Sequence, residues 1–307
     1  MRLILYIHLF LILCMSCKKS HENTQCKNEG KGGEGSAFTT YVEMEINKES
    51  PCFNPRDEAE FVYYKKDYIN NKFQIIKHNI STQQEYVLAE KKVLSNFSWN
   101  KKGTIVFASD NFTLWTIQDN GSNLKQIINT SYNLSPHWFN NGDTLIFHYS
   151  PDLSTNRKIC MYYNGQYLKY IDNTGLELFT PYQTNEIFYT EYTDDKIIKK
   201  LNLINNIKTD ILKTNVLNIQ GLAFAKSSVF YSAHSGSLYV YHIPTMSVKQ
   251  YKYGCFWKSY THLEISSSGR YILACRENNK TDDGSTYLFW NDIMLLDLET
   301  GEEKQLL

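Results

Sequence analysis

One pattern recurs along most of this chain of 307 residues, and it is clearest between residues 96 and 128. Short apolar and β-branched runs alternate there with turn signals, and Asp119-Asn120-Gly121 is a strong signal for a tight hairpin. The stretch is predicted to form an antiparallel meander of four short strands: one ending at Trp99, then TIVFAS, FTLWTIQ and NLKQII.

The rest of the chain repeats this unit, giving six copies in all. Each copy ends its first strand near an anchor residue and continues into an apolar second strand. The anchors are Phe53, Trp99, Trp138, roughly Thr180, Phe224 and Ile265. Their mean spacing is about 42 residues, and four-stranded units with a period of about 40–45 are typical of propeller blades. The predicted fold is all-β, a six-bladed β-propeller of four-stranded antiparallel blades; a solenoid of aligned strands is the alternative.

The third unit, SPHWFNNGDTLIFHYS at residues 135–150, resembles the repeat of TolB-type β-propellers. In that repeat a Pro, a Trp, a turn ending in Gly and an apolar strand follow in order. SWNKKGTIVFAS followed by LWTIQDNGSNLKQI matches the whole unit, and the resemblance covers residues 50–307. The usual Pro-Asp-Gly turn is intact nowhere, and only residues 18–50 precede the first unit, where TolB itself has an α/β domain. The resemblance therefore implies the fold rather than a particular function.

The N-terminal sequence is typical of an export signal. Arg2 is followed by the mostly apolar stretch Leu3 to Met15, which is shorter than the roughly 20 residues of a membrane-spanning helix. Ser16 directly before Cys17 resembles a bacterial lipoprotein signal, which implies that Cys17 is lipid-modified, although Cys14 and Met15 depart from the usual pattern. An ordinary cleaved signal is the alternative.

These observations predict a signal peptide at 1–16, a flexible tether at 17–36 and a propeller at 37–307. The expected blades lie near residues 50–90, 91–129, 130–172, 173–213, 214–253 and 254–307. Residues 37–46 alternate like a strand and are expected near the ring closure, with pairing onto blade six as one option. Lys18-Lys19 after Cys17 lacks the acidic run that marks surface export in some bacteria. We therefore expect attachment to the periplasmic face of the outer membrane.

Charge and cysteine content narrow the possible partners. The 32 basic and 32 acidic residues balance and form no basic stripe, so nucleic acid is not expected as a partner. No phosphate-binding or nucleophile motif is present, and the histidines occupy different registers, so neither cofactor nor metal is expected. The remaining cysteines have no framework or zinc spacing and are expected to be mostly buried apolar residues. They are Cys26, Cys52, Cys160, Cys255 and Cys275.

Candidate site residues come from the positions just before the anchors, where strand alternation could turn side chains into the axial channel. Cys52, Ser98, His137, Ala223 and Glu264 occupy these positions. Ser98, His137 and Glu264 are candidates for ligand binding, with a polar pocket around His137 and Glu264. The alternative is a set of hydrogen-bonded residues in a wet channel.

A second candidate region is the expected long connection RENNKTDDGSTYLFWND in blade six. Its aromatic residues Tyr287, Phe289 and Trp290 would form a binding patch if they were exposed. The alternative is that the following strand begins earlier and these residues pack on blade one.

Three functions fit the sequence. The first is a lipid-anchored, non-enzymatic module that binds a protein or glycan partner in the cell envelope. The second is a carbohydrate-active lyase or hydrolase that uses histidines or carboxylates of the channel. The third is a purely structural subunit of an envelope complex. Propellers host many unrelated functions, so the fold does not decide among them.

Overall fold

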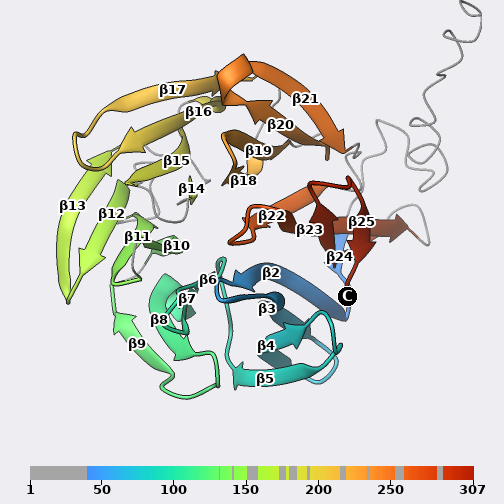
Figure 1. The fold of residues 1–307 in the computed structure, drawn as a ribbon. Helices are drawn as coiled ribbons and strands as arrows, with labels where there is room; N and C mark the ends of the chain where they lie inside the picture. The colour runs from blue at the N-terminus through green and yellow to red at the C-terminus, as the bar shows by residue number, and fades with distance from the viewer. Residues whose placement is uncertain are drawn as a thin grey trace, which may run out of the picture.

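The fold is the expected all-β, six-bladed propeller, with six sheets arranged around a central axis (Figure 1). A computed structural model describes residues 40–130, 132–139, 142–150, 158–172, 178–179, 185–191, 194–214, 219–233, 236–252, 259–281 and 286–307. Consecutive strands pair antiparallel within each sheet, with the first strand nearest the axis. No helix in these ranges is long and apolar enough to cross a membrane.

The strands follow the repeat order of the sequence. Blade 1 contains β2 (Ile46–Asn54), β3 (Asp57–Asp67), β4 (Lys72–Asn79) and β5 (Glu85–Glu90). Blade 2 contains β6 (Ser98–Trp99), β7 (Thr104–Ser109), β8 (Thr113–Gln118) and β9 (Lys125–Ile128). Blade 3 contains β10 (Asn133–Phe139), β11 (Thr144–Tyr149), β12 (Lys158–Tyr163) and β13 (Gln166–Asp172). Blade 4 contains β14 (Leu178–Phe179), β15 (Glu186–Glu191), β16 (Asp194–Asn202) and β17 (Lys208–Lys213). Blade 5 contains β18 (Ile219–Ala225), β19 (Ser228–Ala233), β20 (Leu238–His242) and β21 (Ser247–Lys252). Blade 6 contains β22 (Tyr260–Ile265), β23 (Tyr271–Thr281), β24 (Thr286–Asp297) and β25 (Glu303–Gln305).

The hydrophobic core lies between blades, because each second strand is apolar on both faces. In β7, Ile105 and Phe107 pack with blade 1, whereas Val106 and Ala108 pack with blade 3. All four side chains are completely buried. Successive side chains of a strand point to opposite faces, so one continuous apolar run fills two interfaces. The same division recurs around the ring.

The anchor residues take part in this packing to different degrees. Phe53, Trp99 and Ile265 are buried, and Trp138 and Phe224 are half-buried. Phe224 of blade 5 stacks on the ring of Phe188 in the preceding blade, with 4.6 Å between ring centroids. The anchor expected near Thr180 lies outside the described residues. Three of the cysteines, Cys52, Cys160 and Cys275, are buried free thiols, as expected.

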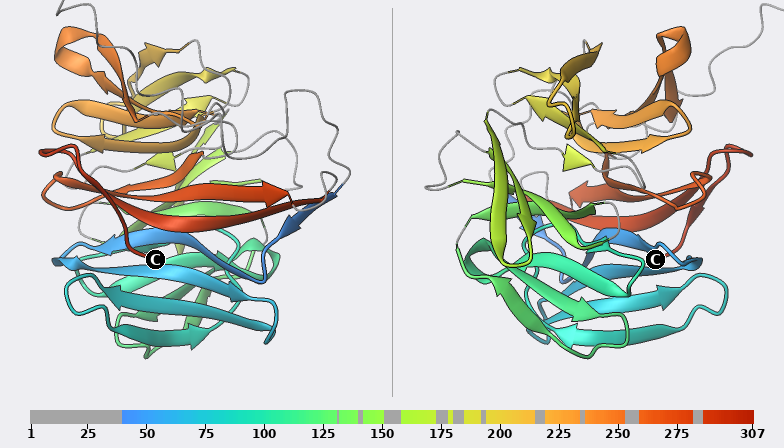
Figure 2. Two further views of the ribbon diagram at one scale, coloured as in Figure 1. Left: turned by 90° about the vertical axis from the view of Figure 1, so that its right-hand side faces the viewer. Right: turned by 60° about the vertical axis from the view of Figure 1, so that its left-hand side comes forward.

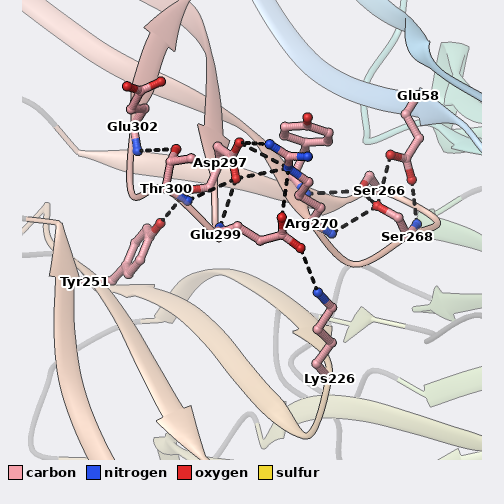
Figure 3. A network of polar contacts seen from close by, with 11 residues as sticks. Glu58, Lys226, Tyr251, Ser266, Ser268, Arg270, Asp297, Glu299, Thr300 and Glu302 are labelled. Atoms are coloured by element: carbon pink, nitrogen blue, oxygen red, sulfur yellow. Dashed lines mark hydrogen bonds and ion pairs between the residues drawn. The ribbon is translucent and has the colours of Figure 1, made fainter.

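The turns between the first and second strands connect neighbouring blades through polar contacts. Across the ring closure, Glu58 of blade 1 accepts hydrogen bonds from the hydroxyl groups of Ser267 and Ser268 at 3.1 and 2.9 Å. Figure 3 shows the contact with Ser268. Lys226 Nζ of blade 5 lies 3.5 Å from Glu299 of blade 6. Similar pairs join blade 1 to blade 2 and blade 2 to blade 3. Exposed pairs of this kind contribute roughly 0–1 kcal/mol each, so they align the blades more than they hold them together.

Both ends of the folded chain pair with β24, which closes the ring. β1 (Thr40–Glu43) lies parallel to residues 286–289, and β25 lies antiparallel to residues 294–296 (Figure 2). The extra strand expected from residues 37–46 therefore pairs with blade six, which keeps all four of its own strands. The short strands β1 and β25 thus pair with different parts of the same edge of β24.

Asn47 connects this closure to blade 1. Its side chain is almost fully buried, and its Oδ1 accepts the backbone N–H of Asn291 in β24 at 2.8 Å. Its Nδ2 donates to Glu49 at 3.2 Å and also to Glu43 in β1. One side chain thus joins β1, β2 and β24.

Replacing Asn47 with alanine should lower the free energy of unfolding by about 1–3 kcal/mol, because the Asn291 amide loses its acceptor in a buried place. Urea denaturation followed by tryptophan fluorescence measures the change. Lys208→Ala, at an exposed position of β17, serves as the control and should stay within about 0.5 kcal/mol of wild type. An Asn47→Ala protein as stable as that control would contradict the assigned role.

Candidate functional site

Three of the described first strands combine an interruption of regular pairing with a residue in the left-handed region. The register shifts between Glu49 and Cys52, between Leu134 and His137, and between Thr261 and Glu264. Each shift contains a residue in the left-handed region: Ser50 with φ 54°, Ser135 with φ 46° and His262 with φ 51°. Such residues cost about 1–3 kcal/mol each, and bulges of this kind redirect neighbouring side chains. Each strained residue precedes a predicted channel position by two residues.

These strands enclose a small axial cavity of about 10 Å³. Blades 1, 2, 3, 5 and 6 contribute to its wall, and its titratable groups are His137, His262 and Glu264. A volume of this size holds roughly one water-sized group. The structure therefore brings together two of the residues predicted from sequence, His137 and Glu264, and adds His262.

Glu264 has an unusual environment for a carboxyl group. Its closest polar contact is the Cys52 thiol, with Sγ 4.0 Å from Oε1. Within the described ranges no basic side chain forms an ion pair with it. Burial raises the pKa of Glu264 from 4.5 to about 8, so the carboxyl is mostly protonated at neutral pH. Perturbed carboxyl groups in a cleft are characteristic of functional sites.

His262 stands beside Glu264 on the same strand and is neutral at physiological pH. Burial, with a further contribution from the charge of Lys66, lowers the pKa of His262 to about 4. Its Nδ1 lies 3.1 Å from Thr261 Oγ1. His262 and Ser50 line both the axial cavity and a second, larger one. They therefore form the boundary between the two cavities.

The larger cavity, called here the mouth cavity, has a volume of about 300 Å³ and lies between blades 1 and 2. Three aromatic rings line it: Phe73 stacks on Tyr64 with 6.4 Å between centroids and meets Tyr68 edge-on at 5.8 Å. Tyr68 is 46% exposed. This volume is at the lower end of the range for small-molecule sites, about 300–1,000 Å³.

Two lysines give the mouth cavity different electrostatic properties on its two sides. Lys66 Nζ contacts Glu43 at 3.0 Å and Glu49 at 2.6 Å, so its charge is compensated. Lys92 is exposed, and its Nζ lies 5.9 Å from the Phe73 ring. Among the described residues no carboxylate pairs with Lys92. An uncompensated cation thus stands at the rim of an aromatic cavity.

The other predicted residues lie elsewhere. Ser98 lines neither cavity; its Oγ accepts the backbone N–H of Trp138 at 2.9 Å and joins blade 2 to blade 3. The expected long connection of blade six is instead a long hairpin, because β23 continues to Thr281 and β24 begins at Thr286. Tyr287, Phe289 and Trp290 therefore lie in β24, where Phe289 and Trp290 are half-buried. Cys17 is outside the described residues.

The sequence could not reveal the mouth cavity. Tyr64 and Phe73 look like ordinary strand residues, and residues 92–95 belong to the connection between two blades. His262 was visible as a histidine at the start of blade six, but the bulge that turns it towards the cavities leaves no trace in residue type. Its position two residues before Glu264, matching Ser50 before Cys52, was the only available signal.

In the described part of the chain, no three His, Cys, Asp or Glu side chains are placed to hold a metal ion. No protein-family model and no curated protein sequence matches the chain.

Comparison with solved structures shows the fold. A putative TolB from Agrobacterium tumefaciens is 12% identical, with a TM-score of 0.58 over 75% of this chain and 86% of that one. An oligogalacturonate lyase in complex with manganese is 10% identical, with a TM-score of 0.53 over 85% and 78%. A chain of a nidogen/laminin complex is 10% identical, with a TM-score of 0.51 over 65% and 77%. The chain is thus a six-bladed propeller similar in fold to TolB and to propellers with other roles.

The shifted pKa values of Glu264 and His262 predict the pH dependence of stability. Between pH 4.5 and about 8 the folded protein keeps the Glu264 proton that the unfolded chain has lost, so the free energy of unfolding falls as pH rises. Between pH 4 and 6.5 the unfolded chain binds a proton at His262 that the folded protein does not, which has the opposite effect. Of these two effects, only that of Glu264 remains above pH 6.5, and it contributes a slope of at most roughly 1.4 kcal/mol per pH unit.

Glu264→Gln should flatten this slope between pH 6.5 and 8, as measured by urea denaturation at several pH values. Glu277→Gln is the matched control, because Glu277 is also a blade-six carboxyl whose pKa is raised by burial but it lines neither cavity. A slope that persists in Glu264→Gln would show that another group titrates.

Proposed function

We propose that this protein is a non-enzymatic binding module of the cell envelope, held to a membrane through a lipid on Cys17, with its ligand site in the mouth cavity. The observation that carries the proposal is the aromatic lining of this cavity beside an uncompensated lysine. Aromatic faces contact sugar rings and apolar side chains alike, and buried aromatic anchors dominate the energetics of protein interfaces. The partner is accordingly a protein or a glycan of the envelope.

The arrangement of the cavity supports binding rather than simple packing. Tyr68 is anchored by a 2.6 Å hydrogen bond from its hydroxyl to Glu43, yet almost half of the side chain is exposed. The ring is thereby fixed in orientation while one part of it faces solvent. A rigid, partly exposed aromatic ring loses little conformational entropy when a ligand covers it.

The N-terminal segment supports placement at a membrane. Residues 1–17 carry the lipoprotein-like signal, and a polar stretch of sequence rich in Gly, Lys and Glu lies between it and the first described strand, β1, which begins at Thr40. An acyl chain contributes ~0.8 kcal/mol per buried methylene, so a multiply acylated cysteine is a firm anchor. We propose that this anchor holds the propeller at the periplasmic face of the outer membrane.

A carbohydrate-active enzyme is the second candidate, and one observation favours it. A carboxyl group that remains protonated at neutral pH, as at Glu264, suits a general acid. A neighbour in fold is an oligogalacturonate lyase that contains manganese, but the described residues here provide no set of three metal ligands. Turnover of a polyuronide panel, with and without added Mn²⁺, would establish this alternative in place of the binding module.

Removing the exposed ring of the mouth cavity should abolish partner capture. Protein immobilised through a C-terminal tag is expected to retain a stoichiometric partner from detergent-solubilised envelope, whereas Tyr68→Ala should retain at least tenfold less. Tyr86→Ala is the matched control, since Tyr86 is 51% exposed on the outer strand of the same blade and does not line the cavity. Equal capture by wild type and Tyr68→Ala would contradict the site.

Cys17→Ser should move the protein from the membrane to the soluble fraction and eliminate labelling by a clickable palmitate analogue. Cys26→Ser, in the adjoining segment, should leave both unchanged. Membrane association that survives Cys17→Ser would rule out the proposed anchor.

A further inference from the structure

The two cavities adjoin each other. Ser50 and His262 line both of them and form the boundary between them. The inner part has space for about one water-sized group, and the outer part is about 300 Å³. A ligand that fills both parts must have a slender head and a broader body.

The axial cavity contains a carboxyl group with no cationic partner among the described residues. Glu264 touches the Cys52 thiol of β2, and His137 of β10 and His262 of β22 complete the titratable groups around it. Lys66 and Glu49 lie beyond, and Glu43 and Glu49 compensate the charge of Lys66. No positive charge of the described protein is therefore available to an ionised Glu264.

We propose that the axial cavity binds the primary ammonium group of a peptide, from a lysine side chain or from the N-terminus, with Glu264 as its counter-ion. The rest of that peptide lies against Tyr64, Tyr68 and Phe73 in the mouth cavity. The inference rests on the proposed function and specifies the ligand of the same site.

Size and charge both favour an ammonium group at this position. An ammonium head is about the size of the water molecule that the cavity can hold, whereas a sugar ring is too large to pass beyond His262. Lys92 at the rim has no described carboxylate partner and is placed to receive a carboxylate of the same peptide. The site therefore offers a carboxyl group at its inner end, which becomes negative when it loses its proton, and a positive charge at its rim, an arrangement that suits a peptide carrying both charges.

The protonation state of Glu264 predicts the direction in which ligand affinity changes with pH. Burial holds the proton on Glu264 in the free protein, and a bound ammonium would stabilise the ionised form. The proton must then leave on binding, so affinity rises with pH between 6.5 and 8, by up to tenfold per pH unit. A ligand oxygen that accepts a hydrogen bond from the protonated carboxyl would give the opposite trend.

The experiment uses four short peptides, each amidated at its C-terminus and tested with the full chain by isothermal titration calorimetry. One has a lysine and an acetylated N-terminus, the second a free N-terminus and no lysine, and the third is the first with its lysine side chain acetylated. The fourth repeats the first with an additional glutamate, to test Lys92.

We expect the lysine peptide to bind at least tenfold more tightly than its acetylated form and to release about one proton, measured from buffers of different ionisation enthalpy. If the bound ammonium group belongs to a lysine side chain, the affinity should show the full rise from pH 6.5 to 8, because the pKa of the lysine amine is about 10.4. If the bound ammonium group is the N-terminus of the peptide, the rise in affinity should be flatter, because an α-amino group itself loses its proton near pH 8. The glutamate peptide should bind more tightly than the first, and Lys92→Ala should remove that gain.

Glu264→Gln should reduce the preference for the free amine to less than threefold, and Glu277→Gln should retain it. Equal binding of free and acetylated amines, or an affinity that falls as pH rises, would overturn the inference on wild-type protein alone, without reliance on any variant. If that happens while capture of an envelope partner still depends on Tyr68, the amine inference fails and the binding module stands. If neither the preference for a free amine nor the Tyr68-dependent capture of a partner is observed, the proposed function is contradicted as well.

Discussion

The structure depends on burial that no blade can achieve alone. The apolar second strands bury one face against the preceding blade and the other against the following blade, as the split of Ile105 and Phe107 from Val106 and Ala108 shows. An isolated four-stranded meander would expose both faces to water. Closure of the ring is therefore required for the stability of every unit. This requirement explains why the contacts at the closure, through Asn47 and Glu58, are polar and specific as well as apolar.

The regular pairing of the blades is interrupted in first strands near the axis. The first strands of blades 1, 3 and 6 carry bulges with Ser50, Ser135 and His262 in strained conformations. These departures place Ser50 and His262 at the boundary between two cavities. The conforming parts of the repeat make the scaffold, and the deviations from it make the site, which is consistent with strain concentrating at functional positions.

Much of the architecture could be predicted from the sequence, because periodic burial leaves a periodic pattern of residues. Six units and their strand order follow from it, whereas pairing with blade six was one option for the strand expected at residues 37–46, and the pairing of residues 40–43 confirms it. His137 and Glu264 could be found because they occupy the same register as Cys52. The mouth cavity could not, since its wall depends on the path of residues 92–95 between two blades. The polar residues of the blade-six hairpin resemble a loop, but the alternative reading, in which the following strand begins earlier, is confirmed: β24 begins at Thr286 and pairs with β1.

The division of β24 between two short strands has a consequence for how the chain acquires its structure. β1 is among the first parts of the ring to be synthesised, yet its partner, residues 286–289, is made some 246 positions later. Its edge stays unpaired while five blades assemble, and the entropy lost in closing so long a loop is recovered only in the last step. Folding should therefore end with a slow docking of blade 6 between blades 5 and 1. The wall of the axial cavity comes from blades 1, 2, 3, 5 and 6, so the surroundings of the axial carboxyl are complete only when the ring closes.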